Sequence, residues 1–461
     1  MIQSIRPRHL IGLITLACMA AGCSFIPPYR RPDLPVSSTF PGGAASAPRA
    51  AASELPWRSF ILDPRSRRLI DLALDNNRDF RLAILAVERA QAQYRISRSE
   101  TVPHVSGDAG FRRAGSTETT TSQWNASVGT TAYELDLFGR IRSLNARALE
   151  EFFAAEENQR SAHITLVAEV AAQHFTLQQA NEQVALARQT LAAVEASHAL
   201  NQATHDAGAT SELDLRTSEA QVQTARINII TYQRQADLAE NRLVELVGAP
   251  IPSGLPASRP LDARGVLAAV PAGLDSAVLL DRPDILAAEH TLKAAEADIG
   301  AARAAFFPTI TLSGTAGVSS AELRNLVGGG NGVWSFAPQV SVPIFDGGRN
   351  RATLDASEVR AREEIATYEK AIQSAFREVA DALATRESLS RQIDVQRALL
   401  KTQQRRYELA DLRYRQGEEL YLNVLSAQRD LYSAQQQLID ATYDRLVNDI
   451  TLYKALGGGW H

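Results

Sequence analysis

Residues 139–150, GRIRSLNARALE, and residues 348–359, GRNRATLDASEV, open two copies of the pattern that decides the fold. Three glycines of the first copy recur in the second at the same offset of 209 (348 − 139, 417 − 208, 457 − 248). Between these glycines neither copy contains Gly or Pro, which predicts in each a helix of about 68 residues followed by one of about 39. Because such a period is far longer than that of compact repeats, it indicates a duplicated half-molecule. The glycine pairs are Gly139 and Gly348, Gly208 and Gly417, and Gly248 and Gly457.

Composition limits the classes of function. The chain has 461 residues, 48 basic and 52 acidic, and neither sign forms a block that would favour nucleic acid, so a nucleic-acid partner is not expected. Its two cysteines, Cys18 and Cys23, lie in the first 23 residues. The rest of the chain therefore has no disulfide and no thiolate metal site.

The N-terminus has the pattern of an export signal, predicted over residues 1–22. Arg6 and Arg8 precede an uncharged apolar run that is too short for a stable membrane span. The run ends in Ala20-Ala21-Gly22-Cys23, which resembles the lipobox of bacterial lipoproteins and predicts covalent lipid, such as palmitate, at Cys23. Ser24 permits sorting to the outer membrane in such lipoproteins. A plain secretory signal cleaved elsewhere is the alternative.

The remaining chain divides into four predicted segments. Residues 23–63 form a Pro-rich extended segment, 64–250 the first repeat, 251–280 a Gly/Pro-rich linker, and 281–461 the second repeat. Each repeat is expected to start with a helix, one over 64–103 and the other over 284–307, before the pattern changes at a proline.

After each proline the sequence alternates with a period of two, which predicts a pair of strands of about 10 residues in each repeat. No segment has 18 consecutive apolar residues, so a second membrane element would have to be a β-barrel. Four strands are too few to close one. We therefore expect the chain to pool its strands with copies of itself, Trp124 and Trp334 lying in an aromatic girdle. A soluble sheet packed on helices is the alternative.

The hairpin tips are the parts of the long helices farthest from the strands. In each tip a glycine is expected to end the first helix, and Ser or Glu to open the second. A partner approaching from the side opposite the strands meets these tips first. The predicted docking residues are Gly208, Ala209, Gly417 and Glu418.

Several stretches together resemble one family, the outer-membrane efflux channels of the TolC type and, within it, the lipid-anchored OprM-like branch. The resemblance extends over essentially the whole chain after Cys23. The stretches that carry it are residues 23–29 (CSFIPPY), 280–285 (LDRPDI), 302–308 (ARAAFFP), 345–349 (FDGGR) and 452–460 (LYKALGGGW).

That resemblance implies an α+β membrane protein. Three copies would form a 12-stranded barrel in the outer membrane and a 12-helix tunnel, or α-barrel, through the periplasm. It also implies two protein partners, a periplasmic membrane-fusion adaptor and an inner-membrane pump of the resistance-nodulation-division class. The periplasmic constriction would fall at Leu422 and Ser426. Many relatives have an acidic residue where this chain has Ser426. Asp214 of the first repeat, whose equivalent in the second repeat is Asn423, is therefore a candidate for the negative charge at the constriction.

No enzyme motif is found. The eight histidines form no metal-ligand pair, and no nucleophile elbow or phosphate loop occurs, so neither catalysis nor a cofactor is expected. The expected function is a passive exit duct for drugs or other small toxic compounds. An outer-membrane component of type I secretion or of metal efflux is one alternative. A periplasm-spanning structural lipoprotein is another, although a scaffold has no use for strands with a lipid-facing alternation.

Overall fold

The computed structural model describes residues 24–41, 56–262, 267–268 and 275–458, and the predicted signal peptide and Cys23 lie outside them. The chain forms two compact units. The first contains residues 24–33, 85–156 and 286–370, and the second contains most of the rest of the described chain. Each unit therefore combines segments of both repeats.

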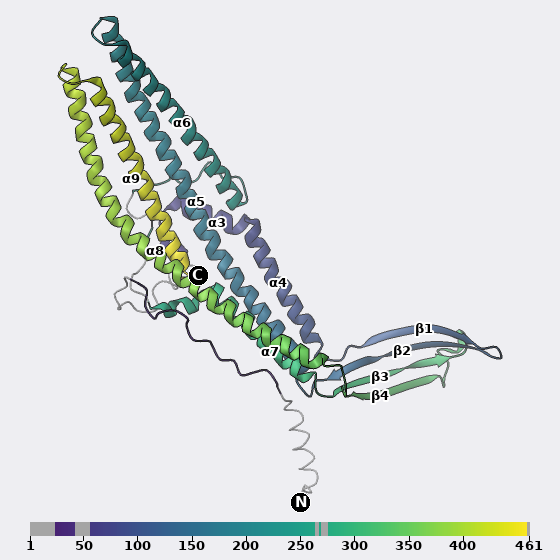
Figure 1. Ribbon diagram of the computed structural model, residues 1–461. Helices are drawn as coiled ribbons and strands as arrows, with labels where there is room; N and C mark the ends of the chain where they lie inside the picture. The colour runs from purple at the N-terminus through teal and green to yellow at the C-terminus, as the bar shows by residue number, and fades with distance from the viewer. Residues whose placement is uncertain (1–23, 42–55, 263–266, 269–274, 459–461) are drawn as a thin grey trace, which may run out of the picture. The chain divides into compact units, whose positions relative to one another are not determined.

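Two helical hairpins dominate the chain (Figure 1). Helices α5 (Arg140–Asp206) and α8 (Arg349–Arg415) have 67 residues each. The helices that follow them are α6 (Glu212–Val247), with 36 residues, and α9 (Tyr421–Ala455), with 35. The predicted long and short helices of each copy are thus confirmed, and α5 is about 100 Å long at 1.5 Å per residue.

The repeat is also visible in the backbone. Glycines at equivalent places adopt positive φ, 77° at Gly208 and 79° at Gly417, then 71° at Gly248 and 73° at Gly457. L side chains rarely adopt this left-handed conformation, so it stops a helix without strain only at glycine. The 209-residue offset therefore preserves the places where the chain must turn.

The helix predicted over 64–103 is interrupted. The chain has α2 (Trp57–Phe60), then α3 (Pro64–Asn76) and α4 (Arg78–Ser99). Between α3 and α4, Asn77 is extended, with ψ 132°. Its side-chain oxygen accepts a hydrogen bond from Phe80 N at 2.8 Å, and its amide donates to the Leu246 carbonyl at 2.8 Å. The prediction of one continuous helix was wrong because asparagine can both end one helix and cap the next.

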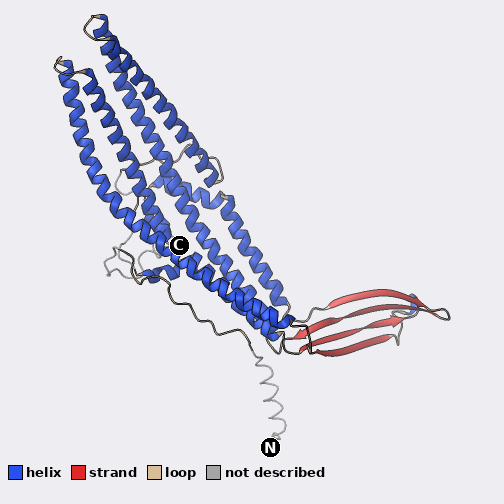
Figure 2. Cartoon of the chain, viewed as in Figure 1, coloured by secondary structure: helices blue, strands red, loops and turns tan. Residues whose placement is uncertain are grey.

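In the second repeat, the short η1 (Ser276–Asp281) precedes α7 (Pro283–Ala304). The strands are β1 (Ser106–Gly115), β2 (Thr120–Leu135), β3 (Thr309–Ser320) and β4 (Gly332–Ser341), with η2 (Leu323–Asn325) between the last two. They form one antiparallel sheet in the order β1-β2-β3-β4 (Figure 2). Each repeat contributes one hairpin, and β2 and β3 join them.

Every residue of the outer strands β1 and β4 is exposed. At the centre of the sheet the strands approach closely, since a Cβ on Gly129 would lie 2.2 Å from the Gly314 carbonyl oxygen. A bulge between Thr130 and Tyr133 places Ala132 at φ 55°. These observations contradict the alternative of a sheet packed on helices.

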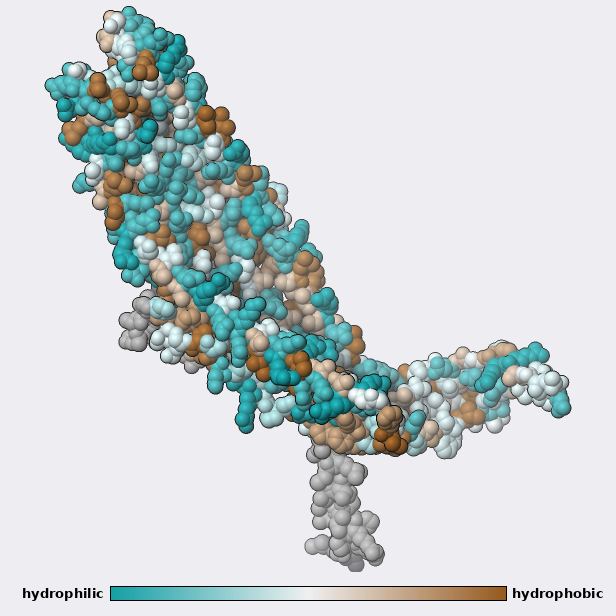
Figure 3. All heavy atoms as spheres, viewed as in Figure 1, coloured by the Kyte–Doolittle hydropathy of each residue, from teal (hydrophilic) through white to brown (hydrophobic). Residues whose placement is uncertain are grey.

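Each unit has its own packed interior. In the second unit Phe60 stacks on Tyr453 with ring centroids 4.0 Å apart, and Val170 of α5 is wholly buried. In the first, Phe307 stacks on Phe25 and on Phe138. Polar residues cover most of the visible face of the long hairpins in Figure 3. In the part of the chain that the structure describes, no helix combines the length and apolarity needed to cross a membrane.

Candidate functional site

The two hairpin tips have the same turn. Gly208 N donates to the His205 carbonyl at 2.8 Å, and Gly417 N donates to the Tyr414 carbonyl at 2.9 Å. One residue later, Ala209 N reaches the Thr204 carbonyl, and its counterpart Glu418 N reaches the Arg413 carbonyl, both at 2.9 Å. This is the paired hydrogen bonding of a Schellman motif, which satisfies the last carbonyls of a helix. All four predicted docking residues therefore lie in the turns.

The starts of the second helices differ. Ser211 caps α6 and accepts a hydrogen bond from Asp214 N at 3.2 Å, as predicted. At the equivalent place in the other tip the cap residue is Leu420, not Glu419 or Glu418, and its side chain makes no cap bond. The Glu419 carboxylate instead accepts from Leu420 N at 3.2 Å and from Asn423 Nδ2 at 2.6 Å. The prediction that Glu opens α9 was wrong. Glu419 precedes the cap residue Leu420, and its longer side chain reaches forward to bind the backbone N–H of Leu420 and the Asn423 amide.

The predicted constriction residues of the second hairpin share the first turns of α9. Leu422 is 65% exposed and Asn423 is exposed, whereas Ser426 is half-buried. The Ser426 hydroxyl accepts from Arg406 of α8 at 3.3 Å, and Arg406 also forms an ion pair with Asp430 at 2.5 Å. A carboxylate is therefore present one turn beyond Ser426, already paired within the hairpin.

The Asp214 side chain binds within its own hairpin tip. Its carboxylate accepts from the Ser211 hydroxyl at 2.7 Å, closing a box with the cap bond from its own backbone. Burial raises the pKa of Tyr414 and of Tyr421, and the charge of Asp214 adds to this effect. No direct bond joins Asp214 to Leu422, Asn423 or Ser426 among the described contacts.

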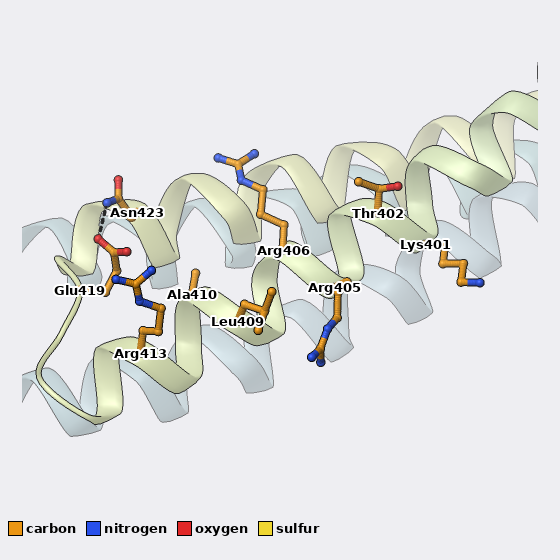
Figure 4. A pocket seen from close by; sticks show the side chains of 9 residues that line it. All are labelled: Lys401, Thr402, Arg405, Arg406, Leu409, Ala410, Arg413, Glu419 and Asn423. Carbon is orange, nitrogen blue, oxygen red and sulfur yellow. Dashed lines mark hydrogen bonds between the residues drawn. The ribbon is translucent and has the colours of Figure 1, made fainter.

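A groove of about 690 Å³ runs along α8 and α9 beside these residues (Figure 4). Arg406 points toward α9, and the Glu419 carboxylate holds Asn423 at one end of the groove. Of its cations, Arg405 pairs with Glu408 at 3.1 Å and Arg406 with Asp430, so much of the positive charge is compensated. The lining cations are Lys401, Arg405, Arg406 and Arg413.

Two features of the tips escaped the sequence analysis. Leu213, the counterpart of Leu422, is 76% exposed, so an exposed leucine stands at the same place in both tips, and the second tip adds Leu420. Between the hairpins, the wholly buried Asn201 of α5 accepts a hydrogen bond from the Tyr414 hydroxyl of α8 at 2.6 Å. The duplicated leucine was visible in the sequence, whereas no sequence pattern pairs Asn201 with Tyr414.

The segment that follows Cys23 lies along α7. Ile26 contacts Gly300 so closely that a Cβ there would lie 2.6 Å from the isoleucine side chain. Further on, Arg31 forms an ion pair at 2.6 Å with Glu289, whose side chain is 4% exposed. Lys293 also binds Glu289, at 3.0 Å, and lies over the Tyr29 ring. These contacts fix residues 25–31 as a strap on α7.

Among the described residues, no group of three or more His, Cys, Asp or Glu side chains is arranged to hold a metal ion. The candidate site thus consists of turns, exposed leucines in both tips, and charges that are largely compensated. Such a surface can contact a protein partner or line an opening.

Comparison with known proteins agrees with this architecture. The family model "Outer membrane efflux protein" matches residues 69–249 and 274–458. Over 466 residues the chain is 44% identical to the toluene efflux pump outer membrane protein TtgC of Pseudomonas putida and to the antibiotic efflux pump outer membrane protein ArpC of the same species. In both cases 98% of this chain and 96% of the relative are covered.

A solved structure is similarly close. The crystal structure of the open state of the MtrE outer membrane channel of Neisseria gonorrhoeae superposes with a TM-score of 0.89 at 40% identity. The match covers 95% of this chain and 99% of that one.

Proposed function

The chain belongs to the outer membrane efflux protein family, and on that premise we propose that three copies of it form a passive exit duct with a periplasmic constriction at the hairpin tips. It is an outer-membrane component of a tripartite efflux pump and extends into the periplasm. The family is one of transport components and not of enzymes.

The open sheet is the observation that supports self-assembly. Among the described strands, β1 and β4 each have one edge that pairs with no other strand. Unpaired backbone groups in an apolar membrane interior cost several kcal/mol each, roughly, so the edges need partners. In a rotationally symmetric trimer each copy adds four strands, so the free edge of one copy can pair with that of the next. The same symmetry places six helical hairpins in a ring.

The tips are where we place the protein partners. The docking residues Gly208, Ala209, Gly417 and Glu418 lie in the two Schellman turns, which differ in side chains but share one backbone path. A periplasmic adaptor would contact both turns of each copy. The adaptor in turn would connect the duct to an inner-membrane pump of the resistance-nodulation-division class, which supplies the energy.

For the constriction we propose Leu422 as the apolar ring, with Ser426, Asn423 and Asp214 nearby. An exposed leucine repeated three times around an axis obstructs hydrated solutes without any charge. Since Asp214 and Asp430 are held within their own copy, the ring would not act through free carboxylates.

The proposed cargo follows the relatives, whose names specify toluene and antibiotics. A type I secretion or metal efflux partner is the second candidate, because the charges of the groove beside the tips are largely compensated and do not favour one class of substrate. The lipid at Cys23 is also part of the proposal. It would anchor the strap that packs on α7 at Ile26, close to the sheet.

Conductance in a planar lipid bilayer tests the duct. Purified protein is expected to form pores that are nearly closed, and Leu422→Ala is expected to raise the single-channel conductance. Leu213→Ala, which removes the same side chain at the equivalent place of the first hairpin, is the matched variant. Absence of pores in the wild type and in both variants would overturn the proposal.

A further inference from the structure

A second cavity lies away from the tips, between α5, α6 and α9 of the second unit. Its volume is about 730 Å³, within the range of small-molecule sites, roughly 300–1,000 Å³. Side-chain amides dominate its wall. They belong to Gln173, Gln179, Gln183, Gln235, Gln436 and Gln437.

Hydrogen bonds to the protein fix the orientation of three of these amides. Gln173 Nε2 donates to the Ala239 carbonyl at 2.9 Å. Gln179 Nε2 and Gln183 Nε2 both donate to Asp440 Oδ1, at 2.7 and 3.1 Å. A carbonyl and a carboxylate can only accept, so each glutamine must direct its NH₂ group at the protein. Their carbonyl oxygens are left as acceptors.

One of these acceptors is orphaned. Gln183 is 4% exposed, and its Oε1 has no hydrogen-bond partner in the described structure. A buried acceptor without a donor costs about 1–3 kcal/mol, and Gln183 lines the cavity, so a donor there would be stabilised once the Gln183 side chain turns its oxygen toward it. The wall also carries a negative charge, because Asp440 lines the cavity. None of the residues lining it is Lys, Arg or His, so no cation of the wall compensates this charge.

We propose that this cavity binds small organic cations that carry several N–H donors, of the oligoamine class. Protonated amines match a wall of carbonyl oxygens around one carboxylate, both in charge and in hydrogen-bonding direction. A bare metal ion fits less well, because a coordination shell fills only a small part of 730 Å³. This inference does not depend on conduction through the duct.

Isothermal titration calorimetry of the purified full-length protein with spermidine tests the proposal at physiological salt. Saturable binding is expected, and Asp440→Asn should weaken it by about tenfold or more, since a hydrogen bond to a charged acceptor is lost. Asp237→Asn is the matched control. Asp237 also accepts from a glutamine, Gln233 at 3.0 Å, but does not line the cavity, so this variant should bind as the wild type does.

A second variant separates binding from folding. Gln183→Met keeps the length of the side chain and removes the orphaned acceptor together with the 3.1 Å bond to Asp440, whose bond from Gln179 stays in place. It should weaken spermidine binding while the thermal unfolding temperature stays near that of the wild type. Sucrose, which has hydroxyl groups but no charge, and CaCl₂ should give no saturable heat. The proposal fails if wild-type protein shows no saturation with spermidine, if calcium binds with equal affinity, or if Asp440→Asn and Asp237→Asn bind alike. Failure of the exit-duct function would instead appear as absent conductance with spermidine binding intact.

Discussion

The hydroxyl of Tyr414 on α8 donates a hydrogen bond to Asn201 Oδ1 on α5 at 2.6 Å and thereby joins the two hairpins near their tips. Asn201 is wholly buried, and Tyr414 also packs against Tyr421, with ring centroids 5.5 Å apart. The bond connects the two repeats at a place where they diverge, since the residues equivalent to Asn201 and Tyr414 in the other copy are Ala410 and His205.

Tyr414→Phe removes the bond and retains the ring. Because a buried acceptor is then left without its donor, the hairpins should be less firmly joined, by about 1–3 kcal/mol. We expect a higher pore conductance in bilayers and faster amide hydrogen exchange in residues 198–206. Tyr407→Phe, seven residues earlier on α8, is the control and should leave both quantities unchanged. Equal conductance of Tyr414→Phe and wild type would show that the bond does not restrain the tips.

Gly417 turns the second hairpin with φ 79°, and no atom lies within 4 Å of a Cβ built there. Gly417→Ala therefore adds conformational strain without a clash, roughly 1–2 kcal/mol. The strain is expected to fray the tip locally and to weaken partner docking more than it lowers global stability. Gly254→Ala has the same free space but no positive φ, and serves as the control. Hydrogen exchange of residues 412–424 measures the effect, and unchanged protection in Gly417→Ala would contradict it.

The buried carboxyl of Asp63 should make the stability of the fold depend on pH in the acid range. Burial alone would raise the pKa of this carboxyl, but His174, 3.5 Å away, and the hydrogen bond from the Ser66 backbone N–H lower it to about 2. Since the ordinary value is 3.8, Asp63 contributes its full stabilisation above that pH and loses it as the pH falls through about 2. Asp63→Asn keeps a residue that can cap α3 and should flatten this acid dependence in circular dichroism melts. Asp75→Asn, an exposed change on the same helix, should retain the wild-type dependence.

Much of the fold follows from local chemistry. The two long hairpins are predictable because their boundaries are glycines at positive φ and no breaker lies between them, and the four strands alternate clearly. The break at Asn77 is not predictable, because it depends on a hydrogen bond to Leu246, 169 residues away. The tips follow the same division: the turns at Gly208 and Gly417 are encoded locally, whereas the bond between Tyr414 and Asn201 requires the packing of distant helices.

Cys23→Ala is expected to abolish acylation, which mass spectrometry of the mature chain measures directly. The strands and helical hairpins through which the copies are proposed to assemble do not include Cys23. The variant should therefore still form oligomers with the conductance of the wild type. Ser24→Ala keeps the cysteine and should remain acylated. Lipid found on Cys23→Ala protein would exclude this residue as the attachment site.

Glu289 holds the strap that follows Cys23. Its side chain is 4% exposed and binds both Arg31, at 2.6 Å, and Lys293, at 3.0 Å. The ion pairs oppose the effect of burial, so the pKa of Glu289 stays below its ordinary value and the carboxylate is charged at neutral pH. Glu289→Gln removes that charge and should weaken strap binding by about 2 kcal/mol, since hydrogen bonds to charged groups contribute roughly 1.5–3 kcal/mol.

Limited trypsin digestion reads out the loosened strap, because cleavage after Arg30 requires residues 25–31 to leave α7. Cleavage should be at least several times faster in Glu289→Gln than in the wild type. Glu296→Gln is the control. Glu296 lies two turns further along α7, and none of the described ion pairs joins it to the strap. Cleavage in that control should match the wild type. If both variants are cleaved at the wild-type rate, the strap is held by Ile26 and the aromatic stack of Phe25 on Phe307, and the ion pairs with Glu289 are not what fastens it.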